Sequence, residues 1–227
     1  MKRRLLLIIL LFATVSGFSK TDETEKPDYK QIEKAVADNS SALYYPKLMI
    51  RYKMADTTLT LEEKRHLYYG FTFQKTYSPY GSSDFEDKLR ELLKKKKLKD
   101  SDYRKIVTFS DSVLSENPFN LAVLDNQLFA FEKLNDATRF NENIIRLNIV
   151  IDVLLSSGDG LKKKSAFYVI STAHEYFLLN VLGFSFGGSQ SLQEHYDYLT
   201  VAKNPDKIKG FYFDVSPCLQ SLDKSFR

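Results

Sequence analysis

The three histidines are the first candidates for chemistry, because histidine is a frequent metal ligand and acid–base group. His174-Glu175, together with His195, is the most metal-like set in the sequence. A zinc protease places two histidines four residues apart on one helix, but Leu178 stands four residues after His174. We therefore interpret Thr172-Ala-His-Glu175 as a helix start with Glu175 as its capping-box acid, and we predict no metal and no cofactor.

Two glycine-containing patterns match catalytic motifs only in part. Gly183-Phe-Ser-Phe-Gly187 has the spacing of a nucleophile elbow, which requires a buried parallel strand before it and a helix after it. Here a predicted helix precedes the pattern and Gly188-Ser189 follows it, so a loop with aromatic anchors is the better interpretation. Gly158-Asp-Gly160 with Lys162-Lys-Lys164 lacks the Gly-Lys-Ser/Thr of a phosphate-binding loop, which favours a solvated turn.

The single cysteine, Cys218, excludes an intramolecular disulfide. None of the histidines is close to it in sequence, so it lacks a local base and is interpreted as a small packed apolar residue. The sequence thus contains no coherent catalytic set. One enzymatic alternative stays open: a hydrolase of peptide or glycan that uses an unfamiliar carboxylate pair, with Glu63 and Glu175 as candidate acids.

Residues 59–89 contain the densest aromatic cluster of the chain. Thr60 and Glu63 fit a capping box that begins a helix. The helix is apolar on two faces, which is typical of a helix that packs between neighbours. Six aromatic residues fall within thirteen positions: Tyr68, Tyr69, Phe71, Phe73, Tyr77 and Tyr80.

This stretch also provides the predicted binding residues. Glu63, Gly70 and Gln74 fall within about 40° of one another around the helix, between its two apolar faces. Gly70 permits the close approach of a crossing helix or a ligand. Two readings remain: the aromatics form the core, or a groove in which tyrosine hydroxyls, Gln74 and Glu63 meet a peptide or glycan. The predicted binding set includes the corner residues Tyr77 and Tyr80.

Residues 28–160 are expected to form helices joined by short turns. Asp28, Thr60 and Ser83 are candidate N-caps, and Pro118 follows Asn117 at one break between helices. The arrangement resembles the architecture of tetratricopeptide-type repeats, although no second copy recurs at a fixed period. We predict an array of antiparallel helix pairs over this region.

From residue 161 the pattern changes. Residues 165–170 read as a strand, and a helix follows that contains Tyr176. Residues 196–201 and 210–215 read as a hairpin, and Ser216-Pro217 begins a terminal helix. The predicted fold class is therefore α+β, mostly α, with the helical array closed by a small antiparallel sheet within residues 161–227.

The N-terminus has the features of an export signal. Lys2, Arg3 and Arg4 precede an apolar run, Leu5–Val15, which is too short to be a good permanent membrane anchor. We predict a signal peptide over residues 1–19 and a flexible linker over 20–27. We therefore expect a soluble exported protein, periplasmic or secreted, with no transmembrane span in the mature chain.

The charge balance argues against nucleic acid as a partner. The chain has 33 basic and 29 acidic residues, and the three basic residues of the predicted signal leave 30 against 29. A net charge of +1 provides little of the positive field on which nucleic-acid binding depends. We expect a protein or peptide partner instead.

Three groups of residues occur in a familiar order and spacing. They are Leu67-Tyr-Tyr-Gly-Phe71 with Tyr77-Ser-Pro-Tyr80, Thr172-Ala-His-Glu-Tyr176, and Tyr196-Asp-Tyr-Leu199 with Phe211-Tyr-Phe-Asp214. In these groups the chain resembles a family of exported Bacteroidetes proteins, catalogued as domain of unknown function 4919. The resemblance covers about residues 29–226 and implies a bacterial envelope setting and a mostly helical fold. It implies no activity, substrate or catalytic residue.

Two functional hypotheses follow. The first is a non-catalytic helical scaffold that binds a protein or peptide partner in the envelope, and the second is the envelope hydrolase. A deep pocket that unites Glu175, His195 and a carboxylate would favour the hydrolase. A shallow aromatic groove would favour the scaffold.

Overall fold

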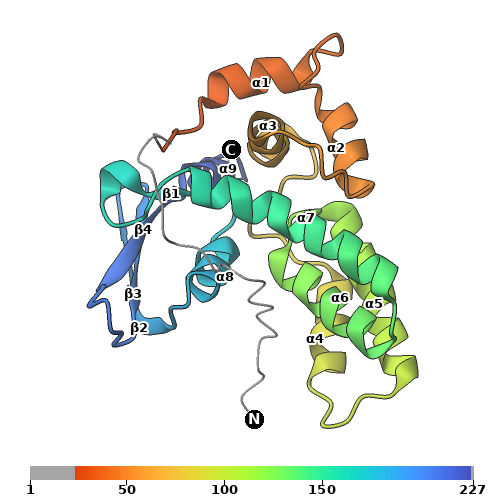
Figure 1. The fold of residues 1–227 in the computed structure, drawn as a ribbon. Coiled ribbons are helices and arrows are strands. Elements are labelled where there is room, and N and C mark those ends of the chain that lie inside the picture. Colours follow the sequence, from red (N-terminus) through yellow and green to blue (C-terminus); the bar gives the residue numbers. More distant parts are fainter. Residues whose placement is uncertain (1–23, 226–227) are drawn as a thin grey trace.

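The computed structural model describes residues 24–225, so the predicted signal peptide lies outside the described residues. The fold is α+β and mostly α, as the sequence predicts (Figure 1). The helices are α1 (Tyr29–Ala37), α2 (Tyr45–Lys53), α3 (Leu61–Gly70), α4 (Asp84–Leu93), α5 (Asp100–Glu116), α6 (Leu121–Lys133), α7 (Ala137–Ser156), α8 (Ala173–Val181) and α9 (Ser216–Ser225), with short 3₁₀ turns η1 (Phe71–Phe73) and η2 (Lys163–Ser165). None of them is both long and apolar enough to cross a membrane.

The predicted N-caps are present. Asp28 accepts hydrogen bonds from the backbone N–H groups of Lys30 and Gln31. Thr60 and Glu63 form a complete capping box, with the Thr60 N–H donating to the Glu63 carboxylate at 2.8 Å. These side chains satisfy backbone donors that a helix start otherwise leaves free.

The aromatic helix ends earlier than its sequence pattern suggests. α3 stops at Gly70, and η1 follows it directly. Thr72 donates its hydroxyl hydrogen to the Tyr69 carbonyl, and the Gln74 amide donates to the Gly70 carbonyl. Side chains thus replace the hydrogen bonds that a further helical turn would have made, and a glycine has the weakest helix propensity apart from proline.

α3 lies between neighbours on both sides. It contacts α1 and α2 on one side and the long helix α7 on the other (Figure 1). Leu67, Tyr68 and Tyr69 are fully buried. The predicted two-sided packing of this helix is confirmed.

The buried apolar residues form two clusters. The larger one joins α1–α3, part of α7, the sheet, α8 and Cys218 of α9. The smaller one lies among α4, α5 and α6 and the start of α7. The larger cluster includes residues from the predicted helical array and from the C-terminal segment, so α3 and the sheet share one core.

The sheet is mixed and has the strand order β1-β4-β3-β2. The predicted hairpin is confirmed: β3 (Tyr196–Val201) pairs antiparallel with β4 (Gly210–Asp214). β1 (Phe167–Tyr168) joins β4 in parallel over two residues, so the sheet is not purely antiparallel. β2 (Phe186–Gln193) pairs with β3 at the edge of the sheet. The sequence suggested a loop at the start of this strand, because glycine and serine have low strand propensity.

Candidate functional site

His174 belongs to a closed hydrogen-bond network. Its Nε2 lies 2.9 Å from the Phe119 carbonyl oxygen, so Nε2 carries the proton and Nδ1 accepts from the Tyr68 hydroxyl at 2.7 Å. The same hydroxyl accepts from the Ile170 N–H at 3.2 Å. Burial lowers the pKa of His174 to about 4. A neutral imidazole with both nitrogens occupied links three distant segments and has no position left for a metal.

Glu175, the next residue on α8, has the opposite environment. Its side chain is fully buried, and neither carboxyl oxygen has a hydrogen-bond partner. The predicted capping role is wrong, because no side chain caps α8 and the Glu175 carboxyl turns into the protein. Burial, with a smaller contribution from the nearby Asp197 carboxylate, raises the pKa of Glu175 to about 9.

Asp197 is the second buried acid of this site. It lies on β3 on the same face as Leu199, and its Oδ1 has no hydrogen-bond partner. Its Oδ2 accepts a hydrogen bond from the side-chain amide of Gln190 on β2. The carbonyl of that amide accepts from the Tyr176 hydroxyl of α8. We call Glu175 and Asp197 the acid pair.

Four exposed apolar side chains surround the acid pair and form what we call the apolar rim. Leu192 lies directly across the strands from Asp197. Tyr80 and Tyr176 interact electrostatically with both acids, and the Tyr176 ring packs edge-on against Phe186 at 5.2 Å. The exposed fractions are 48 % for Tyr80, 37 % for Tyr176, 40 % for Phe186 and 54 % for Leu192.

The Tyr77–Tyr80 corner reaches this site through Cys218. The Tyr77 hydroxyl donates to the Ile170 carbonyl at 2.9 Å and also contacts the Cys218 thiol. Burial raises the pKa of the thiol to about 12, with a further rise from Glu175. Cys218 is therefore a buried thiol and not a nucleophilic thiolate.

β2 is an edge strand that carries neither proline nor charge, although its register against β3 shifts at an irregularity between Phe186 and Gln190. All eight of its residues are exposed, and β3 pairs with only one of its sides. Edge strands normally carry lysine, proline or inward charges that prevent pairing with another chain. Phe186-Gly-Gly-Ser-Gln-Ser-Leu-Gln193 contains no proline and no charged residue.

The predicted stripe of Glu63, Gly70 and Gln74 does not form an open groove. Glu63 is bound to Thr60 and makes an ion pair with Arg51. A Cβ atom on Gly70 would lie 2.8 Å from Val36 Cγ1, so α1 crosses α3 at this glycine. Gln74 caps the Gly70 carbonyl.

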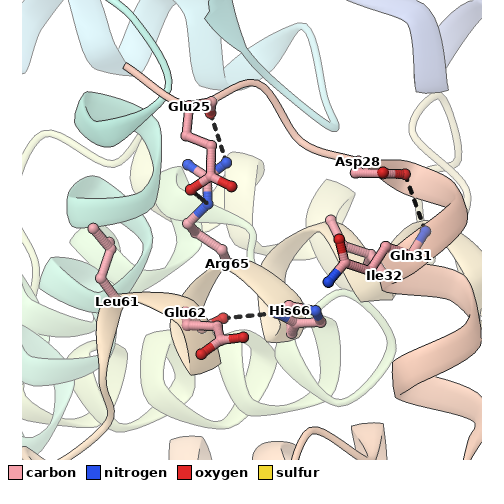
Figure 2. A pocket seen from close by; sticks show the side chains of 8 residues that line it. All are labelled: Glu25, Asp28, Gln31, Ile32, Leu61, Glu62, Arg65 and His66. Atoms are coloured by element: carbon pink, nitrogen blue, oxygen red, sulfur yellow. Dashed lines mark hydrogen bonds and ion pairs between the residues drawn. The ribbon is translucent and has the colours of Figure 1, made fainter. Parts of the chain in front are cut away.

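A separate cleft of about 300 Å³ lies between the chain before α1 and the start of α3 (Figure 2). Arg65 donates to the Glu25 carbonyl at 2.6 Å and to Ser156 Oγ at 3.0 Å. His66 Nδ1 donates to the Glu62 carbonyl, which leaves a buried Nε2 without a partner. Arg65 is thus engaged in holding the chain before α1 against α3 and α7. The other lining residues are Asp28, Gln31, Ile32 and Leu61.

His195 is not part of the acid pair. Its Nε2 lies 3.5 Å from Asp214 Oδ2. Asp214 of β4 pairs with Tyr196, the residue next to Asp197 on β3. Because consecutive residues of a strand point to opposite faces, Asp214 and Asp197 lie on opposite faces of the sheet. Within residues 24–225 no group of three or more histidine, cysteine, aspartate or glutamate side chains is arranged to hold a metal ion.

The comparison with known families identifies the chain. Residues 30–224 match the family described as Domain of unknown function (DUF4919). The protein belongs to this family. Searches of the curated proteins and of the solved structures gave no match. The membership agrees with the resemblance inferred from the three groups of residues. Each group contributes a side chain that is buried in this protein: Tyr68, His174 and Phe213.

Sequence reasoning missed Asp197, Gln190 and the strand that contains Gln190. One signal was available for Asp197: in the predicted hairpin it alternates with Leu199 and therefore occupies a buried register. An acid in such a register needs a partner, which makes it a candidate functional residue. The polar sequence of β2 gave no comparable signal.

Proposed function

We propose that this protein is an exported, non-catalytic binding protein that adds an extended segment of a protein or peptide partner to the edge of β2. The observation that supports this most directly is the uncharged, proline-free edge of β2, which is exposed over eight residues. In recognition by strand addition, main-chain hydrogen bonds provide affinity and alternate side chains provide specificity.

The apolar rim supplies a surface for those alternate side chains. Leu192 and Phe186 lie on β2 itself, and Tyr176 packs against Phe186 from α8. Tyr80, which lies in the turn before α4, interacts electrostatically with both members of the acid pair. Exposed aromatic residues provide large contact areas at low entropic cost, which is common in binding surfaces.

The setting rests on the N-terminal sequence. The basic residues and the short apolar run of residues 1–19 support export, and the near-zero charge of the remaining chain supports a partner other than nucleic acid. The bacterial envelope is the compartment that we infer for the interaction.

The acid pair supports a second candidate, the envelope hydrolase, because hydrolases of glycans work with two carboxyl groups. The binding role is better supported, since a general acid must reach its substrate and both oxygens of Glu175 are buried. Release of reducing ends from peptidoglycan fragments by the wild-type protein, and its loss in Glu175→Gln, would favour the hydrolase.

The experiment that tests strand addition is a screen of immobilised decapeptides with alternating valine and variable positions. The tightest peptide is then resynthesised with N-methyl groups on alternate residues, in both registers. We expect one N-methylated register to lose at least tenfold in affinity, because it blocks the main-chain hydrogen bonds to β2, and the other to bind like the parent.

A pair of double variants locates the contact. Phe186→Ala with Leu192→Ala should weaken binding at least tenfold. The matched control, Ile50→Ala with Met54→Ala, removes two side chains that are also exposed but lie on or next to α2, and should leave binding unchanged. Binding at β2 would be refuted if the two double variants bound the peptide with equal affinity. It would also be refuted if both N-methylated peptides bound as tightly as the parent peptide.

A further inference from the structure

We propose that the acid pair is a subsite for one organic cation, the ammonium or guanidinium group of a lysine or arginine side chain on the strand added at β2. This inference rests on the proposed function and adds a specificity to it. The bound strand would present this side chain on the face of the sheet that carries Gln190, Leu192 and Asp197.

The first step of the argument is the cost of the empty pair. Three of the four carboxyl oxygens of Glu175 and Asp197 have no hydrogen-bond partner, although Glu175 is 0 % and Asp197 5 % exposed. Buried carboxyl groups are normally paired or hydrogen-bonded, because their desolvation is expensive. No lysine or arginine of residues 24–225 makes an ion pair with either group. A cation from a partner would supply the missing counter-charge.

The second step is reach. An added strand lies beside β2, so its residues are two strand spacings, about 10 Å, from Asp197 on β3. A lysine or arginine side chain covers most of this distance, and the aspartate side chain covers the rest. Gln190, which is one strand closer, already crosses this face of the sheet, since its amide donates to Asp197 Oδ2. A polar side chain that extends over β2 can therefore approach Asp197 by the same route.

The third step is displacement. Gln190 and Tyr176 cover the acid pair by hydrogen bonds to Asp197 and to each other. Gln190 is exposed, so its side chain can turn outwards without loss of core packing while Tyr176 stays in the rim. An ammonium or guanidinium group carries the charge opposite to that of a carboxylate, so its hydrogen bond includes an ion-pair attraction that the neutral Gln190 amide lacks. A lysine or arginine therefore replaces the Gln190 amide at a gain.

The fourth step is the exclusion of a metal. Calcium takes six to eight oxygen ligands, and magnesium keeps several waters beside one or two carboxylates, but Glu175 is fully buried and has no access to such a water shell. Among the described residues no third histidine, cysteine or carboxylate joins the pair to hold a metal ion. The groups that interact electrostatically with Glu175 are the Asp197 carboxyl, the Tyr80 and Tyr176 phenols and the Cys218 thiol. The two phenols at the rim offer ring faces and hydroxyl oxygens, which suit an organic cation.

The test uses two arms. In the first, Leu192→Lys places an ammonium group directly across the strands from Asp197, and Leu192→Gln is its control. We expect Leu192→Lys to melt about 2–4 °C above Leu192→Gln at pH 7, the shift that about 1 kcal/mol produces in a protein of this size. In the background Glu175→Gln with Asp197→Asn this difference should vanish. An equal Tm for Lys and Gln in the native background would overturn the proposal.

The second arm uses the peptide selected in the screen, resynthesised with lysine, glutamine or norleucine at the position that faces Leu192. The lysine peptide should bind the wild type at least tenfold tighter than the glutamine peptide, and the double variant Glu175→Gln/Asp197→Asn should bind both alike. Equal binding of all three peptides by the wild type overturns the cation subsite while strand addition stands. If no peptide binds, strand addition fails and the first arm alone decides whether the pair accepts a cation.

Discussion

Two consecutive residues of α8, His174 and Glu175, belong to different buried polar groups. His174 lies in a network with Tyr68, Phe119 and Ile170, which we call the paired region, whereas Glu175 belongs to the acid pair. His174 has a partner on each ring nitrogen, and its partner Tyr68 uses its hydroxyl as donor and acceptor. Glu175 has no partner at all, and it faces a second buried acid. Both side chains are buried to the same extent, so burial alone does not distinguish them.

The difference indicates what each region does. A satisfied buried network fixes one packing arrangement, and this one joins α3, the start of α8 and the turn before α6. An unsatisfied buried pair costs stability, and a protein retains it where something else uses it. The paired region therefore builds the fold, and the acid pair marks where a partner is expected.

The largest expected effect is the pH dependence that Glu175 imposes. The pKa of Glu175 is about 9 in the folded protein and near 4.5 when unfolded, so between these values the native state binds the additional proton. The free energy of unfolding should fall as pH rises, by up to about 1.4 kcal/mol per unit. Glu175→Gln removes this loss. The free energy of unfolding of the variant should therefore exceed that of the wild type by an amount that grows from near zero at pH 4.5 to a limit of about 6 kcal/mol at pH 9.

Urea denaturation of the two proteins at pH 5, 7 and 9 measures this difference. Glu194→Gln is the matched control, because Glu194 is 72 % exposed and its substitution should leave the pH profile of the wild type unchanged. Parallel profiles for the wild type and Glu175→Gln would mean that Glu175 is solvated, and the contrast with His174 would disappear.

The next effect tests the paired region. Tyr68→Phe leaves the Ile170 N–H and His174 Nδ1 without partners, and we expect a loss of about 2–5 kcal/mol in the free energy of unfolding, since each orphaned buried group costs about 1–3 kcal/mol. Tyr69→Phe is the control: Tyr69 is equally buried, but its hydroxyl reaches the Tyr168 carbonyl only at 3.5 Å. Its other partner, Ser157, keeps hydrogen bonds to the Leu154 carbonyl and the Tyr168 N–H when the Tyr69 hydroxyl is removed. That variant should lose about 1 kcal/mol. Equal losses would show that the network adds nothing beyond burial of the ring.

The sequence predicted the paired region better than the acid pair, and the reason is physical. The capping box at Thr60 and Glu63, the two-sided packing of α3 and the hairpin of β3 and β4 follow from local patterns of hydrogen-bonding and apolar residues. The acid pair arises because Glu175 of α8 comes near Asp197 of β3, and these two elements are separated along the chain by β2 and its turns. Spacing along the chain contains no information about that contact, so Glu175 resembled a helix cap.

The smallest effect concerns Gly70, where the paired region also requires exact packing. A Cβ atom at this position would lie 2.8 Å from Val36 Cγ1, closer than carbon atoms approach without displacement. Gly70→Ala should therefore destabilise the protein by about 1–3 kcal/mol through overpacking, despite the better helix propensity of alanine. Thermal unfolding monitored by circular dichroism measures the loss.

The second substitution Val36→Ala separates packing from binding at this glycine. It removes the methyl group that the new Cβ would strike, so Gly70→Ala with Val36→Ala should be no less stable than Val36→Ala alone. Peptide binding at β2 should be the same in all of these variants, because the nearest neighbours of a Cβ atom at Gly70 are Val36 and Tyr45 and include no residue of β2 or of the acid pair. If Gly70→Ala kept its stability but no longer bound the peptide, the binding site would lie at α3 and not at β2.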